Sequence, residues 1–271
     1  MNKLQLAACS VLVAGMCSCL SGNGSSDADS RKNEKLEELN RQFEAGNMTA
    51  SEYNKKRAEI LEATGRDNKE FFGSVGGHQY VDLGLSVKWA TCNLGAGKEV
   101  GSGEFYAWGE IQPKSRYNWK NYALSKGSDH MLTKYCSESI YGVDDKKSLL
   151  EESDDAASAN WGKKWRIPTS AECDELKNGC TWVWTNDYNG TGVAGRKGTS
   201  IKNGAVIFFP AAGFRLDDKL SGVGELGYYW ASNLDKNDNG SACFLYLDGS
   251  SLVTSSYFRM GGLNIRPVVV K

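Results

Sequence analysis

The chain has 271 residues, which is long enough for one large or two small domains with a substantial buried core. Its composition is that of an ordinary globular protein, and its formal net charge of -1 argues against a strongly basic nucleic-acid binder. Only two histidines, His78 and His130, are present to support histidine-based catalysis or a transition-metal centre. No apolar run approaches the roughly 20 residues that a membrane-spanning helix requires.

The first 30 residues predict export followed by a tether. A short basic start precedes a mostly apolar run over residues 4–16, the size of a signal-peptide core. Ser18 and Cys19 follow, and a small residue before a cysteine resembles the lipobox of bacterial lipoproteins, whose cysteine is acylated. We therefore predict a signal peptide over residues 1–19 ending at lipidated Cys19, and a polar tether over residues 20–30. The alternative is an ordinary cleaved secretory signal.

Residues 31–66 predict a small α-helical hairpin. Leu36, Leu39 and Phe43 repeat at helical spacing, and a second helix begins at the capping box formed by Thr49 and Glu52. Two short helices with so few apolar residues bury too little surface to be stable alone, so we expect them to dock on something.

The hairpin resembles SHOCT-type segments, which are thought to mediate oligomerisation. This resemblance implies self-association through the apolar residues of the hairpin, and the alternative is a solvated helical spacer. The residues in question are Leu36, Leu39, Phe43, Tyr53 and Leu61.

The main domain is predicted over residues 78–271, where short apolar or aromatic runs alternate with Gly/Asn/Asp/Ser turns. Two helices are expected. One covers residues 154–161, with an acidic start, and the other opens with the capping box of Thr169 and Glu172 and stops at Gly179. Many short strands with two helices in the middle predict an α+β domain.

A series of motifs in this domain resembles the Fibrobacter succinogenes major paralogous domain family, common in lipoproteins of Bacteroidetes. The resemblance implies a C-type-lectin-like fold, similar in shape to formylglycine-generating enzymes and to the variable proteins of diversity-generating retroelements. The motifs are Val81-Asp82-Leu83-Gly84-Leu85, Trp89-Ala90-Thr91-Cys92-Asn93, Phe105-Tyr106-Ala107-Trp108-Gly109, Trp165-Arg166-Ile167-Pro168, Phe209-Pro210-Ala211-Ala212-Gly213, Tyr228-Tyr229-Trp230-Ala231 and Ile265-Arg266-Pro267-Val268.

Large and charged residues within these motifs are interpreted as structural. Trp89, Trp108, Trp165 and Trp230 each lie beside small residues, which allows their rings to pack between close strands. Arginines within apolar strands must find partners, and we expect carboxylates or carbonyls to provide them. The arginines are Arg166, Arg215 and Arg266, and the candidate carboxylates are Asp82, Asp154 and Asp155.

The sequence predicts no catalytic centre, no cofactor and no metal site. No zinc pattern, phosphate loop or nucleophile elbow is present. The loop containing Asp235, Asn237, Asp238 and Asn239 has the oxygen ligands that calcium prefers, but a solvated Asx-rich turn is the favoured interpretation. The five domain cysteines are odd in number, and mostly free thiols are favoured over a Cys173–Cys180 bridge. They are Cys92, Cys136, Cys173, Cys180 and Cys243.

The loops near the carboxyl end are the predicted binding face. In the retroelement-diversified proteins, the segment resembling this one contacts the ligand, and its residue types offer broad contact with adaptable hydrogen bonds. The predicted contacts are Asn233, Asp235, Lys236, Tyr246, Asp248, Tyr257 and Arg259. The alternative is that these are ordinary exposed loop residues.

The resulting expectation is a lipid-anchored protein of the cell envelope, at the outer membrane, with a non-catalytic domain that binds a protein or glycan ligand. Both the periplasmic and the surface face remain open. One alternative is a structural envelope protein without a dedicated ligand. The other is an enzyme of the formylglycine-generating or sulfatase-modifying type, which would need an accessible thiol of low pKa.

Overall fold

The computed structural model describes residues 34–39, 41–42, 45, 47–48, 52–53, 56, 59–60 and 71–270. The predicted signal peptide, Cys19 and the tether lie outside these residues, as do Phe43 and Leu61 of the hairpin. Leu36 and Leu39 lie in a helical stretch over residues 34–39, and Tyr53 is also helical. Self-association through the hairpin stays a prediction. Among the described residues, no helix combines the length and apolar character needed to cross a bilayer.

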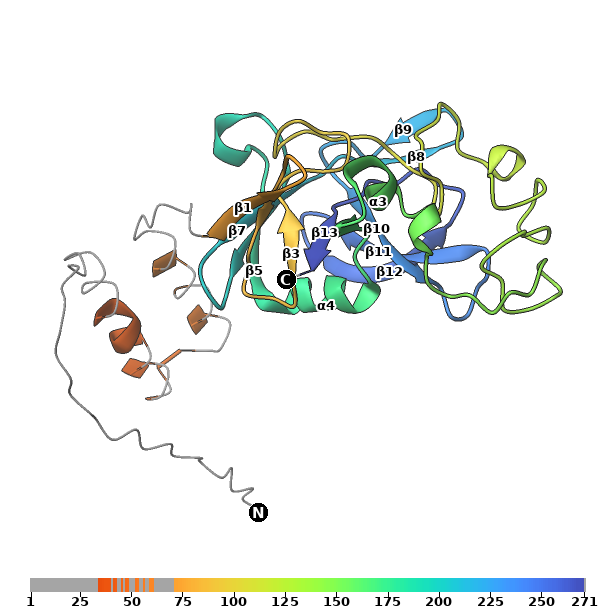
Figure 1. The fold of residues 1–271 in the computed structure, drawn as a ribbon. Helices are drawn as coiled ribbons and strands as arrows, with labels where there is room; N and C mark the ends of the chain where they lie inside the picture. Colours follow the sequence, from red (N-terminus) through yellow and green to blue (C-terminus); the bar gives the residue numbers. More distant parts are fainter. Residues whose placement is uncertain are drawn as a thin grey trace, which may run out of the picture.

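A five-stranded sheet brings the two ends of the main domain together. Its strands are β1 (Phe72–Val75), β2 (His78–Val81), β3 (Val87–Ala90), β13 (Val268–Val270) and β4 (Trp165–Arg166), in the spatial order β1-β2-β3-β13-β4. All neighbours are antiparallel. The last strand of the chain, β13, therefore lies between β3 and β4 in the middle of the domain (Figure 1).

Three smaller sheets complete the domain. One has the order β10-β11-β12, with β10 at Gly227–Leu234, β11 at Ser241–Leu247 and β12 at Leu252–Phe258. A second has the order β5-β6-β7, and β8 and β9 form a separate hairpin. Their bounds are Cys180–Thr185 (β5), Gly195–Ser200 (β6), Val206–Pro210 (β7), Phe214–Leu216 (β8) and Lys219–Ser221 (β9).

Both predicted helices form. Helix α3 (Ala156–Trp161) begins after Asp155, whose side chain accepts a hydrogen bond from the Ser158 amide. Helix α4 (Ser170–Gly179) begins with the predicted capping box, in which the side chains of Thr169 and Glu172 each accept a hydrogen bond from the other's backbone amide. Short 3-10 turns are η2 (Trp119–Asn121), η3 (Glu152–Asp154) and η4 (Tyr188–Gly190). The α+β class is therefore confirmed.

The four tryptophans predicted to be structural are all buried, with at most 1% of each exposed. The indole groups of Trp108, Trp165 and Trp230 also donate hydrogen bonds to backbone carbonyls. The Trp108 Nε1 donates to the carbonyl of Ala231 at 2.9 Å, and the Trp230 Nε1 donates to that of Tyr106 at 2.7 Å. Each ring thus fills the core and joins distant parts of the chain.

Arg166 and Arg266 find carboxylate and carbonyl partners, as predicted, but the three candidate aspartates are not their hydrogen-bond partners. Arg166 forms a bidentate pair with Glu172, because the capping box of α4 brings that side chain to the strand. Arg266 donates to the Asn93 side chain and to backbone carbonyls, and Arg215 lies over the Phe105 ring. The buried guanidinium of Arg266 is therefore held by amide and carbonyl oxygens, whereas the partly buried Arg166 has a carboxylate partner.

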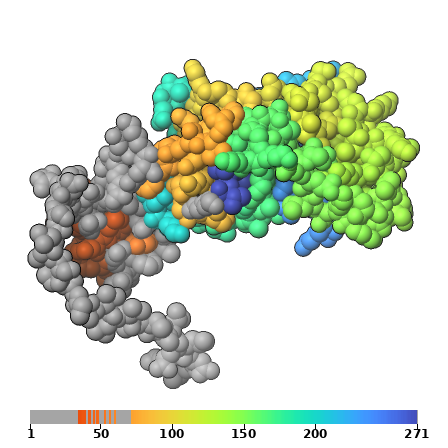
Figure 2. Space-filling model, viewed as in Figure 1, coloured from red at the N-terminus to blue at the C-terminus, as the bar shows by residue number. Residues whose placement is uncertain are grey.

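A long segment of little regular structure forms one end of the domain. Residues 110–150 cover that end in Figure 2, coloured yellow to green. Within residues 110–150, η2 is the one regular element, and the rest consists of loops and isolated bridges.

The five domain cysteines are all free in the structure. A Cys173–Cys180 bridge is therefore absent, and the favoured interpretation of free thiols is confirmed.

Candidate functional site

The predicted binding residues do not form one surface. Successive side chains of a strand point to opposite faces of a sheet. Tyr246 lies opposite Val253 in the ladder between β11 and β12, and both therefore point away from the face that carries Thr254. Thr254 contacts α4, and it shares a groove with Asn233, Asp235 and Lys236. The predicted set is thus divided between the two faces of the β10-β11-β12 sheet.

Arg259 is a correction to the predicted set, because it is fully buried, with 0% of its surface exposed. Its guanidinium donates to the backbone carbonyls of Lys134, Tyr135 and Asn239 and to the Tyr122 hydroxyl, at 2.8 to 3.1 Å. The sequence places Arg259 just after a strand with exposed residues, which suggested a surface position. The side chain instead turns inward and holds the long loop segment of residues 110–150.

Asp248 organises a turn. Its carboxylate accepts hydrogen bonds from the amides of Ser250 and Ser251 and from the Tyr246 hydroxyl, the last at 2.6 Å. Chiefly because of the hydrogen bond from Tyr246, the pKa of Asp248 falls to about 2, while the same bond raises the pKa of Tyr246 to about 12. These oxygens are engaged within the chain, so they fix the loop between β11 and β12.

The loop considered for calcium is an Asx-rich turn, as favoured. The Asp235 carboxylate accepts from the amides of Asn237 and Asp238, and the Asp238 carboxylate accepts from the amide of Gly240. Asn239 is buried and accepts from the Ser137 amide at 2.7 Å. The side-chain oxygens thus support the backbone of the loop.

Tyr246 and Tyr257 belong to an aromatic cluster that the sequence indicated only in part. We call it the tyrosine face, and it lies on one side of the β10-β11-β12 sheet. Tyr228 is at its centre, stacked on Phe244 with ring centroids 4.8 Å apart and 5.4 to 5.6 Å from the other two tyrosines. Its residues are Phe214, Tyr228, Phe244, Tyr246 and Tyr257, all but Phe244 partly exposed.

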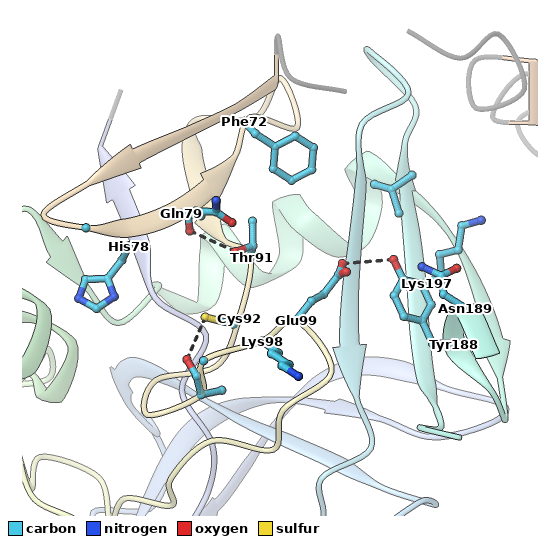
Figure 3. Close-up of a pocket in the computed structure, with 14 residues that line it drawn as sticks. Phe72, His78, Gln79, Thr91, Cys92, Lys98, Glu99, Tyr188, Asn189 and Lys197 are labelled. Atoms are coloured by element: carbon cyan, nitrogen blue, oxygen red, sulfur yellow. Dashed lines mark hydrogen bonds between the residues drawn. The ribbon is translucent and has the colours of Figure 1, made fainter. Parts of the chain in front are cut away.

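A cavity of about 770 Å³ opens elsewhere, where the edge of the five-stranded sheet meets the β5-β6-β7 sheet (Figure 3). We call it the polar pocket. Its volume is within the range of small-molecule sites in proteins. The β1–β2 hairpin, the loop after β3, the η4 turn and strands β6 and β7 contribute to it. Its lining includes Phe72, His78, Gln79, Thr91, Cys92, Lys98, Glu99, Tyr188, Asn189 and Lys197.

Glu99 and Tyr188 meet at one side of the polar pocket (Figure 3). The Tyr188 hydroxyl donates to Glu99 Oε1 at 3.2 Å, and the Tyr188 ring is held by stacking on Phe208 at 3.9 Å between centroids. Burial raises the pKa of Glu99, although the positive charge of Arg266 opposes this effect. A carboxyl with a raised pKa in a cavity is a frequent property of functional residues.

Aromatic and apolar groups form other parts of the wall. His78 stacks on Trp161 with ring centroids 4.0 Å apart, and burial lowers the pKa of His78, which favours its neutral form. Phe72 is 38% exposed, so part of its ring is accessible at the pocket. The pocket therefore offers ring faces beside hydrogen-bonding groups.

The thiol in the pocket is not activated. Cys92 Sγ donates to the Ala96 carbonyl at 3.3 Å, and burial raises the pKa of Cys92. Burial also raises the pKa of Cys173 and of Cys243, and that of Cys180 reaches about 12. These groups are held as thiols at neutral pH, whereas a nucleophilic cysteine requires the thiolate.

Sequence reasoning missed the polar pocket because its residues come from segments far apart in the chain. Glu99 and Tyr188 are separated by 89 positions, and neither belongs to a motif with a spacing of its own. The glycines and polar residues over residues 95–103 indicate a loop, but they do not indicate which segment lies opposite it. Comparison of the chain with known protein families, curated proteins and solved structures found no match.

Proposed function

We propose that this protein is a lipid-anchored component of the cell envelope whose C-type-lectin-like domain binds a glycan in the polar pocket without transforming it. The observation that carries the proposal is the composition of that pocket, in which a half-buried carboxyl and two amide side chains lie beside exposed ring faces. The antiparallel pairing of β3 with β13, near the two ends of the domain, supports a lectin-like arrangement.

The chemistry of the pocket suits a saccharide. Sugars present hydroxyl groups, which donate to carboxylates and exchange hydrogen bonds with amides such as those of Gln79 and Asn189. Their C–H faces pack on aromatic rings, and Phe72 offers one at the rim. A predominantly apolar ligand would require a predominantly apolar lining, which the polar pocket does not have.

The arrangement favours binding over catalysis. Glycoside hydrolysis ordinarily uses two carboxyl groups, and Glu99 is the one carboxyl among the described residues that line the polar pocket. An enzyme of the formylglycine-generating type would need an activated thiol, whereas burial raises the pKa of Cys92. These observations support a passive site.

Glycan binding can be tested by screening the full chain on an array of envelope and host glycans, followed by calorimetry on the strongest binder. Glu99→Gln keeps the shape of the side chain but removes its charge, and we expect it to weaken binding by about tenfold or more, as loss of a hydrogen bond to a charged group does. Glu225→Gln is the matched control, because Glu225 is exposed and outside the pocket. Absence of glycan binding would favour a structural envelope protein without a dedicated ligand.

The tyrosine face is a second candidate binding surface, suited to a protein ligand because partly exposed tyrosines give large contact areas. Tyr257→Ala tests it independently of the pocket, since Tyr257 does not line that cavity.

The lipid anchor is tested by metabolic labelling with a fatty acid. The parent chain should incorporate the label, and Cys19→Ala should not. Incorporation that survives in this variant would contradict the assignment of Cys19.

A further inference from the structure

Strand β12 is an open edge of the β10-β11-β12 sheet (Figure 1). It pairs with β11 along one side, over seven residues, Leu252 to Phe258. The strand contains no charged residue and no proline, and Val253 and Phe258 are 43% and 50% exposed. Natural proteins usually protect such edges with charges, prolines or covering loops, because an open edge can pair with another chain.

The hydrogen bonds at the two ends of β12 show which backbone groups face outward. The Asp248 amide donates to the Ser251 carbonyl, and the Arg259 amide donates to the Gly240 carbonyl. In an antiparallel ladder the residues that bond to the neighbouring strand alternate. Residues 251, 253, 255, 257 and 259 therefore bond toward β11, and the even-numbered residues between them face outward.

At three positions of β12 the outward backbone groups have no hydrogen-bond partner within the part of the chain that the structure describes. Phe258 faces outward too, but its carbonyl accepts from the Gly261 amide at 2.8 Å. That bond agrees with the alternation. Among the described residues, no hydrogen bond reaches the outward amides and carbonyls of Leu252, Thr254 and Ser256. These three residues are symmetric about Thr254.

We infer that β12 pairs antiparallel with β12 of a second copy of this chain, about a two-fold axis at Thr254. In this register Thr254 lies opposite its own counterpart, and Leu252 lies opposite Ser256 of the second copy. Each such pair exchanges two hydrogen bonds, so about six hydrogen bonds form and every free outward group of the three residues is used. Such an interface is isologous, as in most homodimers.

Charge supports a second copy as the occupant. Like charges directly opposite each other destabilise a strand pair, and self-pairing places each side chain near its own kind. Strand β12 contributes no charge to that interface. Asp174 of α4 contacts strand β12, because its carboxylate accepts a hydrogen bond from the Thr254 hydroxyl. The charge of Asp174 is paired with Lys177 at 2.8 Å. Lipid anchoring, as proposed, would further raise the local concentration of the chain.

The register is tested by disulfide crosslinking of the full chain in membranes. A hydrogen-bonded antiparallel pair has Cα atoms about 5.5 Å apart, within the range that a disulfide spans. Thr254→Cys should therefore give a covalent dimer on mild oxidation, well above the background of the parent chain. Ser256→Cys is the matched control. Residue 256 would lie four residues along the strand from its counterpart, about 14 Å away. This variant should therefore give no more covalent dimer than the parent chain.

A proline variant separates pairing from random collision. Ser256→Pro removes an outward amide and leaves the bonds to β11 intact, a change that edge strands tolerate. Combined with Thr254→Cys, it should reduce crosslinking to the level of the parent, and Ser256→Ala in the same background should not. Glu225→Gln, at an exposed residue outside the β10-β11-β12 sheet, should leave crosslinking unchanged. Equal crosslinking at positions 254 and 256, no dimer with Thr254→Cys, or crosslinking that survives Ser256→Pro would overturn the inference.

Discussion

Arg259 offers the sharpest test of the structural interpretation, because the sequence suggested a ligand contact and the structure places it in the core. Replacing it with methionine keeps much of the side-chain volume but leaves three backbone carbonyls and the Tyr122 hydroxyl without their donor. A buried polar group left unsatisfied costs roughly 1–3 kcal/mol. Because such losses are not additive and water can enter, we expect Arg259→Met to lower the free energy of unfolding by about 3–5 kcal/mol.

The assay is urea unfolding of the full chain, followed by fluorescence of the buried tryptophans. Arg116→Met is the control, because Arg116 is exposed and contacts Asp218 at 3.3 Å, so its loss should change the free energy of unfolding by less than about 0.5 kcal/mol. Arg259→Lys keeps the charge but not the planar set of donors, and should give an intermediate loss. A loss below about 1 kcal/mol for Arg259→Met would refute the assigned role.

Three further predictions concern the pocket, the loops and the thiols. Burial raises the pKa of Glu99, so ionisation of this carboxyl opposes folding at pH 7. Glu99→Gln should therefore stabilise the protein at pH 7 but not below pH 4, where the carboxyl is protonated. Urea unfolding midpoints measured at the two pH values test this. Gly142 has φ +148°, and a Cβ at this position would meet the backbone carbonyl of Leu132. Gly142→Ala should therefore lower the free energy of unfolding by more than about 2 kcal/mol, as measured by thermal unfolding. Gly190→Ala is the control and should cost less, because a Cβ at Gly190 meets no other atom. Cys173 and Cys180 should resist a thiol reagent in the folded protein and react on unfolding, and mass spectrometry of the labelled peptides would reveal an exception.

The features that the sequence predicted best are those governed by a few neighbouring residues. The capping box at Thr169 needs only a hydroxyl and a carboxylate three positions apart, and it formed as expected. Buried tryptophans beside small residues, such as Trp108 and Trp230, also follow from local composition. The alternation of short strands and turns, together with two helices in the middle, was enough to predict the α+β class.

Features that depend on distant partners were not predictable. Arg166 and Arg266 find a carboxylate and carbonyls, as expected, but the candidate aspartates are not their hydrogen-bond partners, because which oxygen reaches a guanidinium depends on how the strands and α4 are placed. The polar pocket brings together five segments, and no spacing in the chain indicates that Glu99 and Tyr188 meet. The same holds for Arg259, whose position after an exposed strand gave no sign of the carbonyls that surround it.

The central claim, glycan binding in the polar pocket, is tested most directly by hydrogen–deuterium exchange of the full chain with and without the strongest glycan from the array. Bound ligand should slow exchange in peptides covering residues 77–79, 96–99 and 188–189, which line that cavity. The β10-β11-β12 sheet should exchange at the same rate in both samples. Protection confined to that sheet, or no protection at saturating glycan, would contradict the account.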